Sequence, residues 1–286
     1  MILTKKTTVM NREDIKAMVS LLDDTDVEVV SIIETNLKNL GQEAIPILKR
    51  EKENKGLNPT VQKKLEDLVH DMHLSNLFAE FEIWKNTNTS DLLTGLWLIS
   101  KYQFPDLKIE TISEEIKNIQ MEIWLRTQDK MHPNDMVKVL NEVIFEYFMF
   151  EPNIKNFHSP SNSMFNLVLK EKKGNPVALS CLYILLAQKL DLPIYGVNLP
   201  NLFVLIFDYP GYRFYLNPFN RGQVFVEKDI DDYLKQMNIE PNEKYYKSCS
   251  NTEIIKRILT NLSFAYQKAG EEDKRMEINE ILTLFE

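Results

Sequence analysis

Apolar residues recur at helical spacing through the first half of this chain, and this periodicity most constrains the fold. Between residues 12 and 150 they fall three or four positions apart, as Val29, Ile33 and Leu37 do. Side chains at that spacing share one face of an α-helix. Gly41 follows this stretch, and glycine readily adopts the left-handed backbone found at helix ends. We therefore expect the first half to be a set of packed helices.

One part of this half resembles a HEAT repeat. Residues 21–30 and 40–48 give the pattern of two apolar helices joined by a short polar turn. Stacked helical pairs form curved surfaces that bind partner proteins. The alternative is that these helices form a lid packed on the second half. Both interpretations stay open at this point.

The second half changes from helical to strand-like spacing. Gly174 bends the chain and Pro176 suits the first turn of a broadly apolar helix, which we expect to be central and buried. Four short segments rich in β-branched and aromatic residues follow, at 194–199, 203–207, 213–216 and 223–226. A closing helical pair is expected around Gly270. The sequence therefore predicts an α+β fold that is predominantly helical, with a small antiparallel sheet.

Charge and cysteine content exclude several classes of function. The chain has 42 acidic and 34 basic residues, a net charge of −8, so we expect it to bind neither nucleic acid nor an anionic membrane. Its two cysteines, Cys181 and Cys249, cannot build a disulfide framework and suit a reducing compartment. No apolar run reaches the roughly 18 residues of a membrane span. The expected location is the cytoplasm.

His70, Asp71 and His73 are the residues that most resemble a metal site. Two histidines three positions apart can share a helix face, but no third ligand with suitable spacing follows them. We interpret all three as polar residues on a solvated helix. The sequence predicts no metal and no cofactor.

Five segments in order resemble the SirB-type transglutaminase-like proteins, which join a transglutaminase-like core of papain type to a tetratricopeptide-like tail. They are residues 161–163 (SNS), 168–180 (VLKEKKGNPVALS), 187–200 (AQKLDLPIYGVNLP), 216–222 (LNPFNRG) and 257–266 (RILTNLSFAY). The resemblance runs from about residue 136 to the C-terminus. It implies a transglutaminase-like core at 131–240 and a tetratricopeptide-like tail at 241–286, which follow the helical, HEAT-like region that we expect at 1–130.

The resemblance also implies where catalytic residues would lie, and none of the three positions carries one. Such enzymes use a thiolate at a helix N-terminus, a histidine on a neighbouring strand and an acid that orients the histidine. The corresponding positions are Pro176, Leu202 and Asn217. Proline has no nucleophilic atom, leucine cannot transfer a proton, and an amide cannot compensate an imidazolium charge. We therefore expect no catalytic residues.

Nearby side chains offer two alternatives. A displaced hydrolase or amidotransferase would use Cys181 or Ser180, with His158 as the nearest base, although we expect Cys181 to be a buried apolar residue. A small-molecule module would use polar residues of the former cleft, which we also interpret as turn-forming residues. The candidate cleft residues are Cys181, Asn198, Asn201, Asn220 and Arg221. The leading hypothesis is a non-catalytic protein that binds another protein.

Overall fold

The computed structural model describes residues 12–54, 56–128 and 131–286. By the contacts within the chain it divides into two compact units, Met1–Ala79 and Glu80–Glu286. We describe each unit by itself. The three-part division at residues 130 and 240 stays a prediction.

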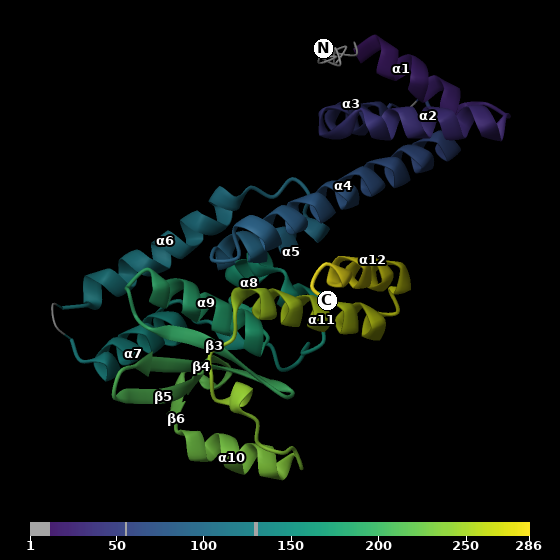
Figure 1. Ribbon diagram of the computed structural model, residues 1–286. Coiled ribbons are helices and arrows are strands. Elements are labelled where there is room, and N and C mark those ends of the chain that lie inside the picture. Colours follow the sequence, from purple (N-terminus) through teal and green to yellow (C-terminus); the bar gives the residue numbers. More distant parts are fainter. Residues whose placement is uncertain (1–11, 55, 129–130) are drawn as a thin grey trace, which may run out of the picture. The chain divides into compact units, whose positions relative to one another are not determined.

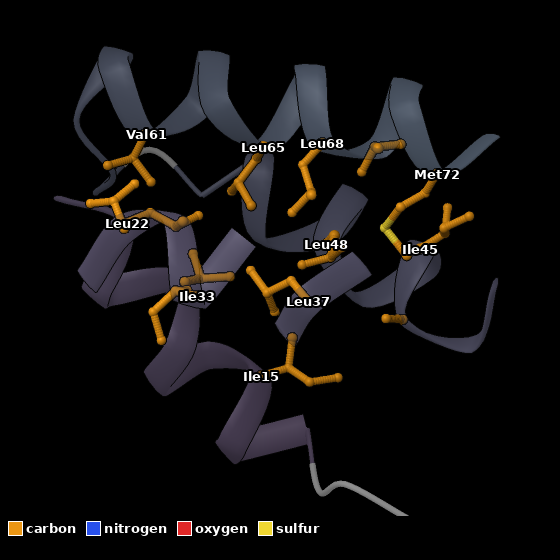
Figure 2. Packing of buried hydrophobic residues seen from close by; sticks show 14 residues of the cluster. Ile15, Leu22, Ile33, Leu37, Ile45, Leu48, Val61, Leu65, Leu68 and Met72 are labelled. Carbon is orange, nitrogen blue, oxygen red and sulfur yellow. The ribbon is translucent and has the colours of Figure 1, made fainter. Parts of the chain in front are cut away.

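The first unit is helical and has its own apolar core. Its helices are α1 (Arg12–Ser20), α2 (Val27–Asn39), α3 (Ile45–Lys52) and the first part of α4 (Pro59–Thr87). Leu37, Leu48 and Leu65 are completely buried where these helices meet (Figure 2). Gly41, two residues after α2, has φ +69°. The helical periodicity of the sequence thus predicted this unit's elements, while the likeness to a HEAT repeat remains a prediction.

The second unit combines helices with a four-stranded sheet. Its helices are the end of α4, α5 (Leu92–Gln103), α6 (Ile109–Arg126), α7 (Pro133–Asn141), α8 (Phe165–Glu171), α9 (Pro176–Gln188), α10 (Glu227–Gln236), α11 (Asn251–Ala269) and α12 (Glu272–Thr283). A π-helical turn, η3 (Glu142–Tyr147), continues α7, and short 3-10 turns, including η4 (Pro160–Ser163) and η5 (Pro218–Asn220), connect other elements. A two-residue parallel pair, β1 (Glu151–Pro152) and β2 (Lys173–Gly174), precedes α9.

The larger sheet is antiparallel, in the order β3 (Ile194–Leu199), β4 (Leu202–Tyr209), β5 (Tyr212–Asn217) and β6 (Gln223–Phe225). Alternate side chains of a strand point to opposite faces. One face packs towards α9 and α11, and the other is covered by α10 through Ile230 and Leu234 (Figure 1). Asn198 and Phe203, which pair across β3 and β4, share the face towards α11.

Helix α9 is the centre of this unit. Every residue from Val177 to Ala187 is buried, so the helix is covered on all sides, as its apolar sequence predicted. With the small antiparallel sheet, this arrangement confirms the predominantly helical α+β fold. Over the residues that the structure describes, no helix is long and apolar enough to cross a membrane.

Candidate functional site

A cavity of about 500 Å³ lies where α9 begins. The segment before η4 contributes Phe157 and His158, and the start of α9 contributes Pro176. Asn201, in the turn between β3 and β4, and Arg257, on α11, complete the lining with their neighbours. Its size is within the range of ordinary small-ligand sites. All of these residues belong to the second unit.

The first turn of α9 offers the cavity no nucleophile. Pro176 is the first helical residue, as predicted, and it has neither a reactive atom nor an N–H. The Asn175 side chain caps the helix by accepting a hydrogen bond from the Ala178 N–H at 2.9 Å. A thiol at this position would lie at the positive end of the helix dipole. This position is instead filled by the side-chain ring of Pro176.

The other two positions that correspond to catalytic residues lie elsewhere. Leu202 packs with the apolar cluster on the α10 face of the sheet and is not among the cavity-lining residues. Asn217 caps η5, where its side-chain oxygen accepts from the Phe219 and Asn220 N–H groups at 3.1 and 3.3 Å. Pro176, Leu202 and Asn217 therefore do not meet in one cavity. Their correspondence to a former catalytic triad stays a prediction.

Cys181 and Ser180 lie more than one turn into α9 and are fully buried. Burial raises the pKa of the Cys181 thiol well above its usual range, and the nearby Cys249 raises it further. The thiol therefore stays protonated near neutral pH, and it does not line the cavity. In the described ranges of the chain, the Ser180 hydroxyl has no hydrogen-bond partner. A buried, apolar Cys181 is what the sequence predicted.

Among the described residues that line the cavity, His158 is the one histidine. Its ring packs edge-on against Phe157 and Phe264, with ring centres 5.1 and 5.3 Å apart. The sequence placed His158 only as a distant base for Cys181. The structure brings it instead to the lining of the cavity, which Pro176 also lines.

Arg257 is the lining residue that the sequence analysis missed. Its Nη1 donates to the Asn198 side-chain oxygen at 2.8 Å and to the Leu199 carbonyl at 3.2 Å. Burial lowers the pKa of this guanidinium. A signal was present, because Arg257, Asn261 and Phe264 recur at helical spacing within residues 257–266, one of the segments that carry the family resemblance, and all line the cavity.

The polar residues expected around the cleft separate into different places. Asn201 lines the cavity, with φ +57°. Asn198 lines a second cavity of about 580 Å³, which is also lined by Cys249 and Arg257. Asn220 bonds to Gln223, and Arg221 donates to the Phe145 carbonyl at 3.2 Å. Asn220 and Arg221 thus take part in turn and packing contacts.

The histidines of the first unit form no recognisable metal centre. Asp71, between His70 and His73 in sequence, pairs with Lys38 at 2.8 Å. Nowhere among residues 12–54, 56–128 and 131–286 do three His, Cys, Asp or Glu side chains group as a metal site requires.

Comparison with known proteins places most of this unit in one family. The model of the family Transglut_core2, a transglutaminase-like superfamily, matches residues 110–260. A UPF0162 protein of Xylella fastidiosa is 24% identical over 214 residues, 67% of this chain and 72% of that protein. The protein SirB1 of Salmonella typhimurium is 22% identical over 212 residues, 72% of this chain and 77% of that protein.

A further relative is much longer than this chain. F-box only protein 21 of Mus musculus is 24% identical over 177 residues, which cover 58% of this chain and 26% of that protein. No solved structure matches the chain.

Proposed function

The chain belongs to the transglutaminase-like superfamily, and from that premise we propose that it is a non-catalytic member that acts by binding another protein. The observation that carries this proposal is the start of α9. Pro176 lines the cavity there, and the Cys181 thiol of the same helix is buried and held protonated. The family's acyl chemistry needs an exposed thiolate at this place.

An exposed apolar surface supports the protein-binding part of the proposal. Met121, Trp124 and Leu125 on α6 are 64, 67 and 65% exposed. Tyr147 of the adjoining η3 is 56% exposed, and the Arg126 guanidinium lies 4.8 Å from its ring centre. Tryptophan, tyrosine, methionine and arginine are enriched in protein interfaces. We propose that this surface, residues 121–126 with Tyr147, contacts the partner.

The rival function is a displaced hydrolase or amidotransferase that uses Cys181 or Ser180. It requires one of these side chains to reach substrate from inside a fully buried helix. The structural features above favour the non-catalytic alternative, since neither side chain lines the cavity.

Transamidation and thiol labelling test the proposal together. The whole chain would be incubated with a glutamine-containing protein and a fluorescent primary amine, and separately with peptidyl amide substrates. We expect no turnover above a heat-denatured control. Iodoacetamide labelling of native Cys249→Ala protein, in which Cys181 is the remaining thiol, should be at least about a hundredfold slower than labelling in urea.

A cysteine placed in the cavity gives the matched comparison. In Cys181→Ala/Cys249→Ala/Pro176→Cys protein, the new thiol lies at the first turn of α9 and should react much faster than Cys181. Turnover by the natural chain that disappears in Cys181→Ala or Ser180→Ala would overturn the proposal. Rapid native labelling of Cys181 would remove its main support.

A further inference from the structure

Arg257 lines both cavities, and although Glu253 also lines the second one, no carboxylate within the described ranges forms an ion pair with its guanidinium. Two of its hydrogen bonds go to neutral oxygens, those of Asn198 and Leu199. Burial lowers the pKa of Arg257, and the nearby Tyr233 and Cys249 side chains oppose that shift. A guanidinium has five N–H donors, and these two hydrogen bonds use only those of Nη1.

Apart from Arg257, the described side chains that line the cavity carry no negative charge. None of the described residues that line it is aspartate or glutamate, although the whole chain carries a net charge of −8. Beside the mouth, the Lys268 ammonium lies 5.3 Å from the centre of the Phe264 ring. An anion entering here therefore meets no like charge in the lining, in contrast to most of this acidic protein.

Aromatic rings line the same cavity as Arg257. Phe157 and Phe264 are each 43% exposed, and the His158 ring contacts both. Exposed aromatic rings at a cavity mouth provide apolar area that a ligand can bury. The cavity thus has a cationic part on α11 and an apolar part at its rim.

We propose that this cavity binds a carboxylate carried next to an aromatic or apolar group, with Arg257 binding the charge. The proposal rests on the proposed function, in that the cavity binds a ligand without transforming it. One guanidinium edge matches one carboxylate through two parallel hydrogen bonds. A phosphate dianion would need further cations, and Arg257 is the only arginine or lysine among the described lining residues.

The test compares two probes that differ in charge and contain no amide or ester bond. 3-Phenylpropionate and 3-phenylpropan-1-ol would be titrated at pH 7 into the ¹⁵N-labelled whole chain, with amide and arginine Nε–H resonances followed by NMR. We expect saturable shifts with a Kd of roughly 1 mM for the acid, and binding at least about tenfold weaker for the alcohol. Equal binding of acid and alcohol would overturn the proposal.

Two variants locate the charge. Arg257→Ala should weaken 3-phenylpropionate binding at least about tenfold. Asn261→Asp keeps Arg257 and adds a carboxylate four residues along α11, in the same cavity lining, so it should also abolish selectivity for the acid. Arg275→Ala on α12 is the control, because that guanidinium pairs with Glu272 at 2.6 Å and lines no part of this cavity. Unchanged binding by Asn261→Asp would contradict the role of Arg257 even if Arg257→Ala is unstable.

The source of the carboxylate is tested with the tripeptide Ala-Ala-Phe. Tighter binding of the peptide than of 3-phenylpropionate supports a protein C-terminus as the ligand, and tighter binding of 3-phenylpropionate supports a free small carboxylate. Binding by neither would overturn the proposal. Turnover in the transamidation and amide assays would contradict the proposed function. 3-Phenylpropionate and 3-phenylpropan-1-ol contain no bond that such an activity could cleave, so binding of these probes is tested independently of it.

Discussion

At the scale of single residues, the two positions that decide the chemistry are close in sequence but lie in different surroundings. Pro176 lines the cavity at the start of α9, while Cys181 lies five residues later inside the core. The field at a helix N-terminus acts over about the first turn. A thiol at position 181 therefore gains little from the helix and is penalised by burial, which raises its pKa.

The raised thiol pKa values predict a loss of stability at alkaline pH. Burial also raises the pKa of Cys249, to about 12. In the unfolded chain both thiols lose their protons near pH 8.5, so above that pH the folded chain binds more protons than the unfolded one. The stabilisation is complete below about pH 8.5 and is lost as pH rises through the folded-state values.

Urea unfolding at pH 7, 9 and 10.5 measures this effect. Relative to Cys181→Ala/Cys249→Ala, the natural chain should lose up to about 1.4 kcal/mol of unfolding free energy per pH unit for each thiol above pH 9. The tyrosines titrate in both proteins, so the comparison isolates the thiols. Parallel curves for the two proteins would contradict buried, protonated cysteines.

The sequence predicted features that follow from the order of residues along the chain. It did not predict which residues, distant in sequence, come together in the folded protein. The family resemblance, Pro176 at the first turn of α9 and the burial of Cys181 are confirmed. Strand alternation places Leu202 on the α10 face, which the motif alone does not specify. Likewise, His158 and Arg257 are about a hundred residues apart, and only the packing of α11 near η4 brings both to one cavity.

At the scale of elements, one asparagine links three parts of the second unit. The Asn141 side chain, at the end of α7, donates to the Gly222 carbonyl at 3.1 Å. Its oxygen accepts from the buried Tyr183 hydroxyl of α9 at 3.0 Å. Gly222, with φ +72°, lies in the turn between β5 and β6. The turn, α7 and α9 are therefore held by the same side chain.

Gly222→Ala should destabilise the protein by about 2–4 kcal/mol. A Cβ atom there would lie 1.9 Å from the Asn141 Oδ1, and a left-handed backbone costs alanine about 1–2 kcal/mol. Displacing Asn141 also removes the shorter of the two hydrogen bonds of the Tyr183 hydroxyl, leaving the one to the Val137 carbonyl at 3.4 Å. Gly211→Ala is the matched control, because Gly211 has φ +79° and open space around its Cβ position. Equal losses in chemical denaturation would show that the Asn141 contact contributes nothing.

The longer helices and strands could be predicted from the sequence, but the shortest elements, the β1–β2 pair and η3, could not. Helical periodicity and β-rich runs indicated most of the helices and the four strands, because both patterns repeat over several residues, but α10 was not predicted. The parallel β1–β2 pair involves two residues on each side, and η3 is a π-helical turn in which Val143, Ile144 and Phe145 are buried. Features this short leave no periodic signal in a sequence.

At the scale of the whole molecule, the chain has two cores. Leu37 belongs to the core of the first unit, and Leu186 of α9 is completely buried in the second. Helix α4 contributes Leu65 to the first core, while its last turns carry Phe81 and Trp84, which are buried in the second unit. Helical spacing predicted α4, but spacing alone cannot show where a long helix passes from one core to another.

Leu37→Ala and Leu186→Ala should act on different parts of the chain. Each removes a completely buried leucine side chain and should cost about 2–5 kcal/mol within its own unit. Hydrogen exchange followed by mass spectrometry should show faster exchange across α1–α3 for Leu37→Ala, with α9 and α11 unchanged, and the reverse for Leu186→Ala. Uniformly faster exchange in both variants would contradict two separate cores.

The closed start of α9 has one more consequence, for how the cavity could diverge among relatives. Proline supplies no backbone N–H there, and the N–H of Ala178 already donates to the Asn175 side chain. The backbone at the start of α9 therefore has few free donors for an anion. The preference for negative ligands that we propose for this cavity then depends on one residue, Arg257, and not on the start of α9. A homologue could keep every helix and strand and still exchange its ligand class through a single substitution.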